Sequence, residues 1–78
     1  MITLNKQVRK YYYQQARDMI FMHRKKFVCT ALRQILADRL HVNIKVQDIP
    51  TYFPEIKNYD HLQDVPRVML DHCIADLS

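Results

Sequence analysis

The sequence predicts an all-α fold, a small helical bundle with an N-terminal helical hairpin, an ordered linker that contains prolines, and a C-terminal helix. Three observations predict this fold. The chain contains no glycine, so tight turns with a positive φ are disfavoured. Residues 3–49 also contain no proline and are rich in residues with high helix propensity. Apolar residues recur there three or four positions apart, which is the period of an amphipathic helix.

The first helix is expected to begin at Asn5 or Thr3, either of which can cap it. Its apolar stripe consists of Val8, Tyr12, Ala16 and Met19, broadened by Tyr11, Tyr13 and Ile20. Residues 23–26 separate this stripe from the next one without a helix-breaking residue. One helix through both stripes would have about 37 residues, whereas globular helices usually have 8–20. Two helices are therefore expected.

The second helix is expected to bury a broad face. This face consists of Phe27, Val28, Ala31, Leu32, Ile35, Leu36 and Leu40. For the last helix, Asp60 or Asp64 is a candidate cap. Asp60 forms a capping-box-like pair with Gln63, and Pro66 is tolerated in a first turn. The buried side of the last helix is expected to contain Val65, Val68, Met69, Cys73, Ile74 and Leu77.

Between these helices, residues 43–59 are predicted to be an ordered linker. Residues 42–46, which overlap the start of this linker, alternate apolar and polar side chains, which fits a short strand or an extended connection. Pro50 and Pro54 are expected to push Ile49 and Phe53 toward extended backbone. The linker side chains expected to pack on the helices are Ile49, Tyr52, Phe53 and Ile56.

The length of 78 residues predicts a single domain over residues 1–78. Two cysteines, Cys29 and Cys73, lie in apolar stretches and allow at most one disulfide, so we expect buried thiols in a reducing compartment. No apolar run approaches the roughly 18 residues of a membrane span, and the N-terminus lacks the apolar core of a signal peptide. The expected location is the cytoplasm, without membrane association.

Charge is distributed unevenly along the chain. Ten of the twelve basic residues and only two acidic ones lie before residue 46, a net charge of +8. From residue 46 onward two basic residues face six acidic ones, a net charge of −4. Such a pattern bears on partners rather than on fold, and it indicates a binding protein.

The sequence contains few residue patterns typical of a metal site or a catalytic site. The potential metal ligands are His23, Cys29, His41, His61, His72 and Cys73. They lack the closely spaced pairs that structural zinc sites use, so no metal or cofactor is expected. The two thiols lie in apolar helical faces that disfavour the thiolate, and the only serine is the last residue. An enzyme is therefore not expected.

Cations and aromatic residues interleave near the N-terminus. The candidate partner-binding or nucleic-acid-binding residues are Arg9, Lys10, Tyr11, Tyr13, Arg17, Arg24, Lys25 and Lys26. Such a surface can contact a phosphate backbone and stack on bases, or it can be a solvated helix face that meets a protein. Residues 36–43 (LADRLHVN) also resemble the opening of a helix-turn-helix motif. However, His41 occupies the position of the turn glycine, and Pro50 would interrupt a recognition helix.

Two short segments resemble small accessory proteins of tailed bacteriophages. Residues 27–32 (FVCTAL) resemble an F-(I/V)-C-x-A-L helix, and residues 52–56 (YFPEI) contain an F-P-E-(F/I) segment. Together they cover about 11 of 78 residues. This resemblance implies a phage context, in which tiny non-enzymatic proteins bind and block a host or defence machine.

The expected function is thus a non-enzymatic protein-binding module, such as a phage-encoded inhibitor. Its basic helical face would dock on an acidic or nucleic-acid-handling surface of a protein and block it sterically. Two alternatives remain. One is a small helical DNA- or RNA-binding protein that uses the same face. The other is a structural homodimer, since neighbouring tyrosines and four methionines favour self-association.

Overall fold

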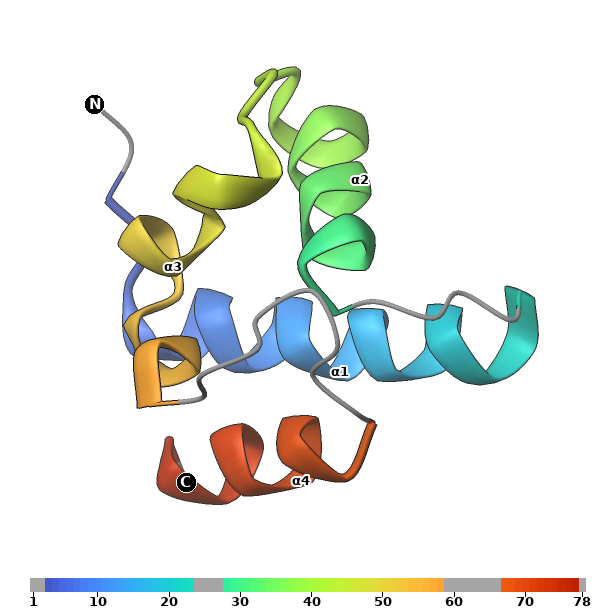
Figure 1. Ribbon diagram of the computed structural model, residues 1–78, viewed down its shortest axis with the longest axis vertical. Coiled ribbons are helices and arrows are strands. Elements are labelled where there is room, and N and C mark those ends of the chain that lie inside the picture. Colours follow the sequence, from blue (N-terminus) through green and yellow to red (C-terminus); the bar gives the residue numbers. More distant parts are fainter. Residues whose placement is uncertain (1–2, 24–27, 59–66, 78) are drawn as a thin grey trace.

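The computed structural model describes residues 3–23, 28–58 and 67–77 (Figure 1). The elements in chain order are α1 (Lys6–His23), α2 (Val28–Leu40), the 3-10 helix η1 (Val46–Asp48), α3 (Ile49–Tyr52), the 3-10 helix η2 (Pro54–Asn58) and α4 (Arg67–Asp76). These described parts contain helices and connections but no strand, which confirms the all-α prediction. Residues 42–45 are consequently a connection and not a strand.

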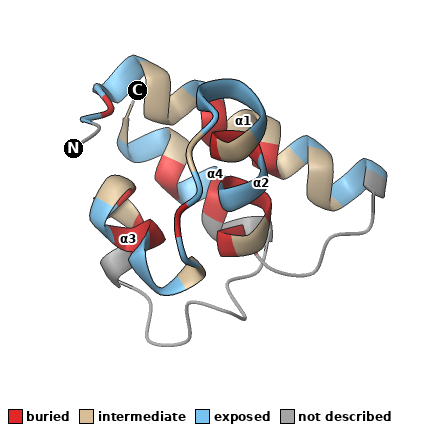
Figure 2. Ribbon diagram, turned by 90° about the horizontal axis from the view of Figure 1, so that it is seen from above, coloured by how far each residue is buried: buried red, intermediate tan, exposed pale blue. Residues whose placement is uncertain are grey.

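The N-terminal region forms two helices, as predicted. The cap of α1 is Asn5, whose side-chain Oδ1 accepts a hydrogen bond of 2.8 Å from the backbone N–H of Val8. The second helix, α2, packs on α1 and rises steeply from its middle (Figure 1). It is α4 that runs back along α1 in the opposite direction. The final turns of α1 project beyond both neighbours in Figures 1 and 2.

The core lies where α1, α2, the linker and α4 meet, and their buried sides face inward (Figure 2). Phe53 is fully buried in this core, and the centroid of its ring lies 5.2 Å from that of Tyr13 and 6.5 Å from that of Tyr12. Full burial of such a side chain contributes about 1.5–3 kcal/mol. The buried apolar residues are Leu4, Tyr12, Tyr13, Ala16, Val28, Cys29, Ala31, Leu32, Ile35, Leu36, Ile44, Ile49, Phe53, Ile56, Leu70 and Cys73.

The prediction of an ordered linker packed on the helices is confirmed within the described residues. Ile49, Phe53 and Ile56 are fully buried, and Tyr52 is half-buried against the core. The buried Cys29 and Cys73 thiols are also as predicted. In the last helix Leu70, which the sequence did not indicate, is fully buried beside Cys73. The predicted residues Phe27, Asp60, Gln63, Asp64, Val65 and Pro66 lie outside the described residues, as do the side chains of Val68 and Met69.

The backbone before Pro50 differs from the prediction. Ile49 adopts the right-handed helical conformation (φ −55°, ψ −42°) and not the extended one. Crowding by the proline ring disfavours this conformation, but two gains offset the cost. The side chain of Ile49 is fully buried, and its carbonyl accepts a 3.0 Å hydrogen bond from the N–H of Phe53. Phe53, which precedes Pro54, is non-helical (φ −126°, ψ 74°).

Two positions on the predicted apolar faces are more exposed than expected. Tyr11 is 50% exposed, whereas its neighbour Tyr13 is fully buried. Leu40, the last residue of α2, is also exposed. In the part of the chain that the structure describes, no helix combines the length and the apolar character that crossing a membrane requires.

Candidate binding groove

The structure places two of the predicted binding residues in an internal network. The guanidinium of Arg9 donates two hydrogen bonds of 3.1 Å to the two carboxylate oxygens of Glu55, and a third to the carbonyl of Leu4. The hydroxyl of Tyr13 donates to Glu55 Oε1 at 2.7 Å. The side chains of Arg9 and Glu55 are each only 14% exposed. These groups join α1 to η2, and the polar atoms of Arg9 and Tyr13 are engaged in contacts within the fold.

The surroundings of Glu55 influence the protonation of the whole network. Burial raises the pKa of the Glu55 carboxyl, but hydrogen bonds from Tyr13 and Arg9 outweigh burial, so its pKa is lowered overall. Burial, followed by the hydrogen bond to Glu55, raises the pKa of the Tyr13 hydroxyl. Glu55 is therefore the ionised acceptor, and Tyr13 is a neutral donor whose position is fixed.

The other predicted binding residues lie outside the network of Arg9, Tyr13 and Glu55. Arg17 Nη1 lies 2.9 Å from Asp71 Oδ1, and this ion pair links α1 to α4 at the surface. Tyr11 is exposed, and its hydroxyl accepts a 2.9 Å hydrogen bond from Gln15 Nε2. Lys10 is half-buried. The remaining candidates Arg24, Lys25 and Lys26 lie outside the described residues.

Part of the opposite charge in the two halves of the sequence is therefore neutralised by ion pairs within the fold. Glu55 and Asp71 come from the acidic half, and each pairs with an arginine of the basic half. Among the other side chains that the structure describes, the two signs are nearly balanced. The cations are Lys6, Lys10, Arg33, Arg39 and Lys45, and the carboxylates are Asp18, Asp38, Asp48 and Asp76.

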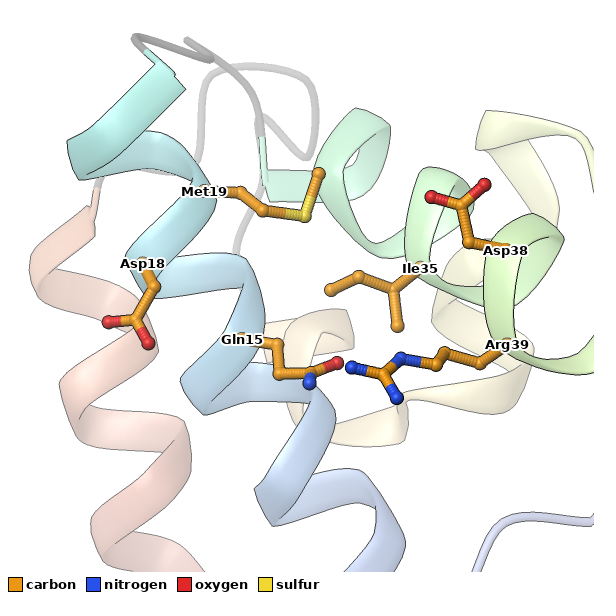
Figure 3. A pocket seen from close by; sticks show the side chains of 6 residues that line it. All are labelled: Gln15, Asp18, Met19, Ile35, Asp38 and Arg39. Atoms are coloured by element: carbon orange, nitrogen blue, oxygen red, sulfur yellow. The ribbon is translucent and has the colours of Figure 1, made fainter.

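A groove lies in the angle between the steeply crossing α1 and α2. It has a volume of about 270 Å³, and its lining residues are Gln15, Asp18, Met19, Ile35, Asp38 and Arg39. Figure 3 shows Met19 and Ile35 extending toward each other from the two helices. At one end the Gln15 amide and the Arg39 guanidinium point toward each other, whereas the two carboxylates are directed away from this pair. The groove thus combines an apolar floor with a polar end.

Exposed side chains extend this groove along α1. Tyr11, Gln15, Met19 and Met22 are separated by four, four and three residues, so they form one stripe on the helix. Tyr11 at one end is 50% exposed, and Met22 at the other is 70% exposed. The groove residues Gln15 and Met19 therefore share one stripe of α1 with an exposed aromatic ring and an exposed flexible thioether, which are side chains that protein-binding surfaces favour.

The resemblance to a helix-turn-helix is limited to the backbone conformation of the turn residue. His41 has a positive φ of 55°, the conformation that the turn glycine of that motif would adopt. The chain then continues as a connection, a short 3-10 helix and the single turn of α3, which contains Pro50. No recognition helix follows α2 in the described residues 41–58.

The surroundings of the potential metal ligands and of the two cysteine thiols bear on their reactivity. Among the described residues, no group of three or more His, Cys, Asp or Glu side chains could hold a metal ion. Burial raises the pKa of the Cys29 thiol. Burial and the nearby carboxylates of Glu55 and Asp76 raise the pKa of Cys73 to about 11. Both thiols are therefore protonated at neutral pH and shielded from solvent.

Comparison with models of protein families, with curated proteins and with solved structures finds no match to this chain. The groove is thus the main guide to function. Its residues were not among the candidates predicted from the sequence. The helical spacing of Tyr11, Gln15 and Met19 is a sequence signal for one wall of the groove. Ile35 was predicted only as part of the buried face of the second helix, and Arg39 was not singled out.

Proposed function

We propose that this chain is a non-enzymatic protein-binding module that holds a segment of its partner in the groove between α1 and α2. One observation carries the proposal, namely an apolar floor of Met19 and Ile35 flanked by exposed Tyr11 and Met22 on the same stripe. Exposed tyrosine and methionine beside a concave apolar surface are common features of protein interfaces.

The groove defines the chemistry of the bound segment. An apolar side chain fits between Met19 and Ile35, and an adjacent carboxylate or carbonyl oxygen can accept hydrogen bonds from Arg39. Burial of one such apolar side chain contributes about 1.5–3 kcal/mol. That is too little for stable binding at micromolar concentration, which needs about 8 kcal/mol. Contacts to Tyr11 and Met22 would have to supply much of the remainder.

This surface differs from the one that the sequence suggested. Arg9, Tyr13 and Arg17 take part in contacts within the fold, so they would act on the partner only by holding α1 in place. Tyr11 remains in the proposed surface. The resemblance to small phage proteins supports a search for the partner in bacteria, where binding would block a host or defence protein sterically.

The proposal is tested by affinity capture from a bacterial lysate with quantitative mass spectrometry. We expect the wild-type chain to retain a protein in near-stoichiometric amount, and Met22→Ser and Arg39→Gln to retain at least about fivefold less. The matched control is Arg33→Gln, which removes an exposed arginine from α2 outside the groove. Circular dichroism verifies that the variants fold. Equal recovery with all variants, or recovery of nucleic acid without protein, would contradict the proposal.

The same material tests self-association. A second copy of the chain could occupy the groove, as in the structural homodimer considered from the sequence. Light scattering should then give twice the mass of the monomer for the wild type and for Arg33→Gln, and the monomer mass for Met22→Ser. If such a dimer forms and no other protein is captured, the partner that occupies the groove is a second copy of this chain.

A further inference from the structure

A second hollow lies against α2, and its lining is polar. It has a volume of about 250 Å³ and is lined by Thr30, Arg33, Gln34, Ala37 and Asn43. Arg33, Gln34 and Ala37 lie three, four and seven positions along the helix from Thr30, so these four residues share one face of α2. Asn43 comes from the connection that follows the helix.

The connection after α2 brings Asn43 to this face. His41 adopts the left-handed conformation with φ 55°, which turns the chain at the end of the helix. The backbone N–H of Val42 then donates to the carbonyl of Leu36 at 3.4 Å, and the side chain of Ile44 is buried in the core. Asn43 is thus held between two anchored neighbours, and its position does not depend on a ligand.

The side chains of this hollow are suited to an anion. Arg33 provides a planar guanidinium, while Thr30 and Asn43 provide neutral groups that can donate hydrogen bonds. The lining, taken over the described residues, contains no carboxylate. The single acidic residue of α2 is Asp38, which lines the α1–α2 groove and accepts a 3.0 Å hydrogen bond from Gln34 Nε2.

We propose that this hollow is an oxyanion site that binds a phosphate group, with Arg33 as the charged partner and Thr30 and Asn43 as neutral donors. An arginine fork matches the geometry of phosphate oxygens, and the hollow leaves room for the group that carries the phosphate. The phosphate can come from free inorganic phosphate or from a nucleic-acid backbone. The site does not depend on the protein-binding groove, since the two hollows share no lining residue.

The test is a titration of the ¹⁵N-labelled chain followed by NMR, first with inorganic phosphate and then with the oligonucleotide dT8, at constant ionic strength set with chloride. We expect saturable shifts of the Asn43 side-chain amide, the Arg33 Nε–H and the Thr30 amide. Arg33→Gln should weaken binding at least about fivefold. The control Lys6→Gln removes an exposed cation of α1 that lines neither hollow, and it should bind as the wild type does.

The two probes distinguish the sources of the phosphate. Saturation by dT8 at a lower concentration than by inorganic phosphate assigns the site to a nucleic-acid backbone, and the reverse order assigns it to free phosphate. The proposal is wrong if neither probe shifts the Asn43 amide, or if Arg33→Gln and Lys6→Gln weaken binding equally. Equal weakening would indicate diffuse attraction to surface charge, which also declines with added salt.

Discussion

Arg9 and Glu55 are 46 residues apart and form a two-point ion pair, with both N–H···O distances at 3.1 Å. The pair connects the first helix to the proline-containing linker, and the Tyr13 hydroxyl adds a third hydrogen bond to the same carboxylate. Because the side chains of Arg9 and Glu55 are only 14% exposed, solvent screens the pair weakly. This contact therefore stabilises the linker on the helices.

The first prediction concerns the loss of this ion pair. Glu55→Gln keeps the shape of the side chain but leaves the mostly buried Arg9 guanidinium without a counter-charge. We expect the free energy of unfolding to fall by about 2–4 kcal/mol, since removal of one partner from a buried pair is costly. In a domain of this size each kcal/mol lowers the Tm by about 4–8 °C. Urea and thermal denaturation followed by circular dichroism provide the measurement.

The matched control for Glu55→Gln is Asp71→Asn, which removes the ion pair with Arg17. The side chains of Arg17 and Asp71 are 35% and 50% exposed, so solvent weakens their attraction. We expect this change to cost less than about 1 kcal/mol. If the two variants lose equal stability, the Arg9–Glu55 pair contributes no more than a surface ion pair.

The second prediction follows from the lowered pKa of Glu55. A carboxyl whose pKa is lower in the folded state stabilises the fold above its unfolded pKa of about 4.3, and this contribution is lost as the pH falls through the folded value. The difference in unfolding free energy between the wild type and Glu55→Gln should therefore be constant above about pH 5 and shrink below about pH 4. Urea titrations from pH 2.5 to pH 7 measure it. A difference that persists unchanged at the lowest pH contradicts the role of the ionised carboxylate.

The local features of the fold were predictable from the sequence. The helical period of Tyr12 and Ala16, the Asn5 cap, and the buried face that contains Leu32 depend on neighbours within a few residues. Such features are set by backbone geometry and short-range hydrogen bonds, so a sequence pattern contains them. The packing of Phe53 was predictable for a similar reason, because an aromatic residue in a short connection has few ways to be buried other than against the helices.

The long-range features were not predictable in this way. Tyr11 and Tyr13 are chemically identical, but only Tyr13 is fully buried, and there Glu55, 42 residues further along, accepts the hydrogen bond of its hydroxyl. The binding groove depends on the steep crossing of α1 and α2, while α4 is the helix that runs back along α1 (Figure 1). Spacing along one helix does not specify the direction of the next. The groove therefore becomes visible only when Met19 and Ile35 are placed in three dimensions.

The third prediction concerns alkaline pH. Burial, followed by the carboxylates of Glu55 and Asp76, raises the pKa of Cys73 to about 11, while a thiol in an unfolded chain titrates near 8.5. The stability that this group contributes is fully present below about pH 8.5 and is lost as the pH rises through 11. Each such thiol lowers the unfolding free energy by up to about 1.4 kcal/mol per pH unit.

Burial also raises the pKa of Cys29, so both thiols are expected to contribute to the alkaline loss of stability. Cys73→Ala should make the decline in unfolding free energy between pH 9 and pH 10 shallower, because one titrating group is removed while Cys29 and Tyr13, whose pKa values are also raised, remain. The slope is the diagnostic quantity, since the cavity left by the substitution lowers stability equally at every pH. Urea denaturation at four pH values gives this slope, and equal slopes for the variant and the wild type would exclude Cys73 as the source.

The fourth prediction concerns the backbone at the end of α2. His41 adopts φ 55°, and this left-handed conformation costs a residue with a side chain about 1–2 kcal/mol. Glycine avoids that cost but loses more conformational entropy on folding, about 0.5–1 kcal/mol. His41→Gly should therefore raise the free energy of unfolding by about 0.5–1 kcal/mol, and the Tm by a few degrees.

His41→Val should lower stability, since a branched side chain fits this conformation poorly. Thermal denaturation of the three proteins at pH 7 should thus rank them Gly, His and Val in decreasing order of Tm. A glycine variant less stable than the wild type would mean that the exposed imidazole makes a contact worth more than the backbone strain it imposes.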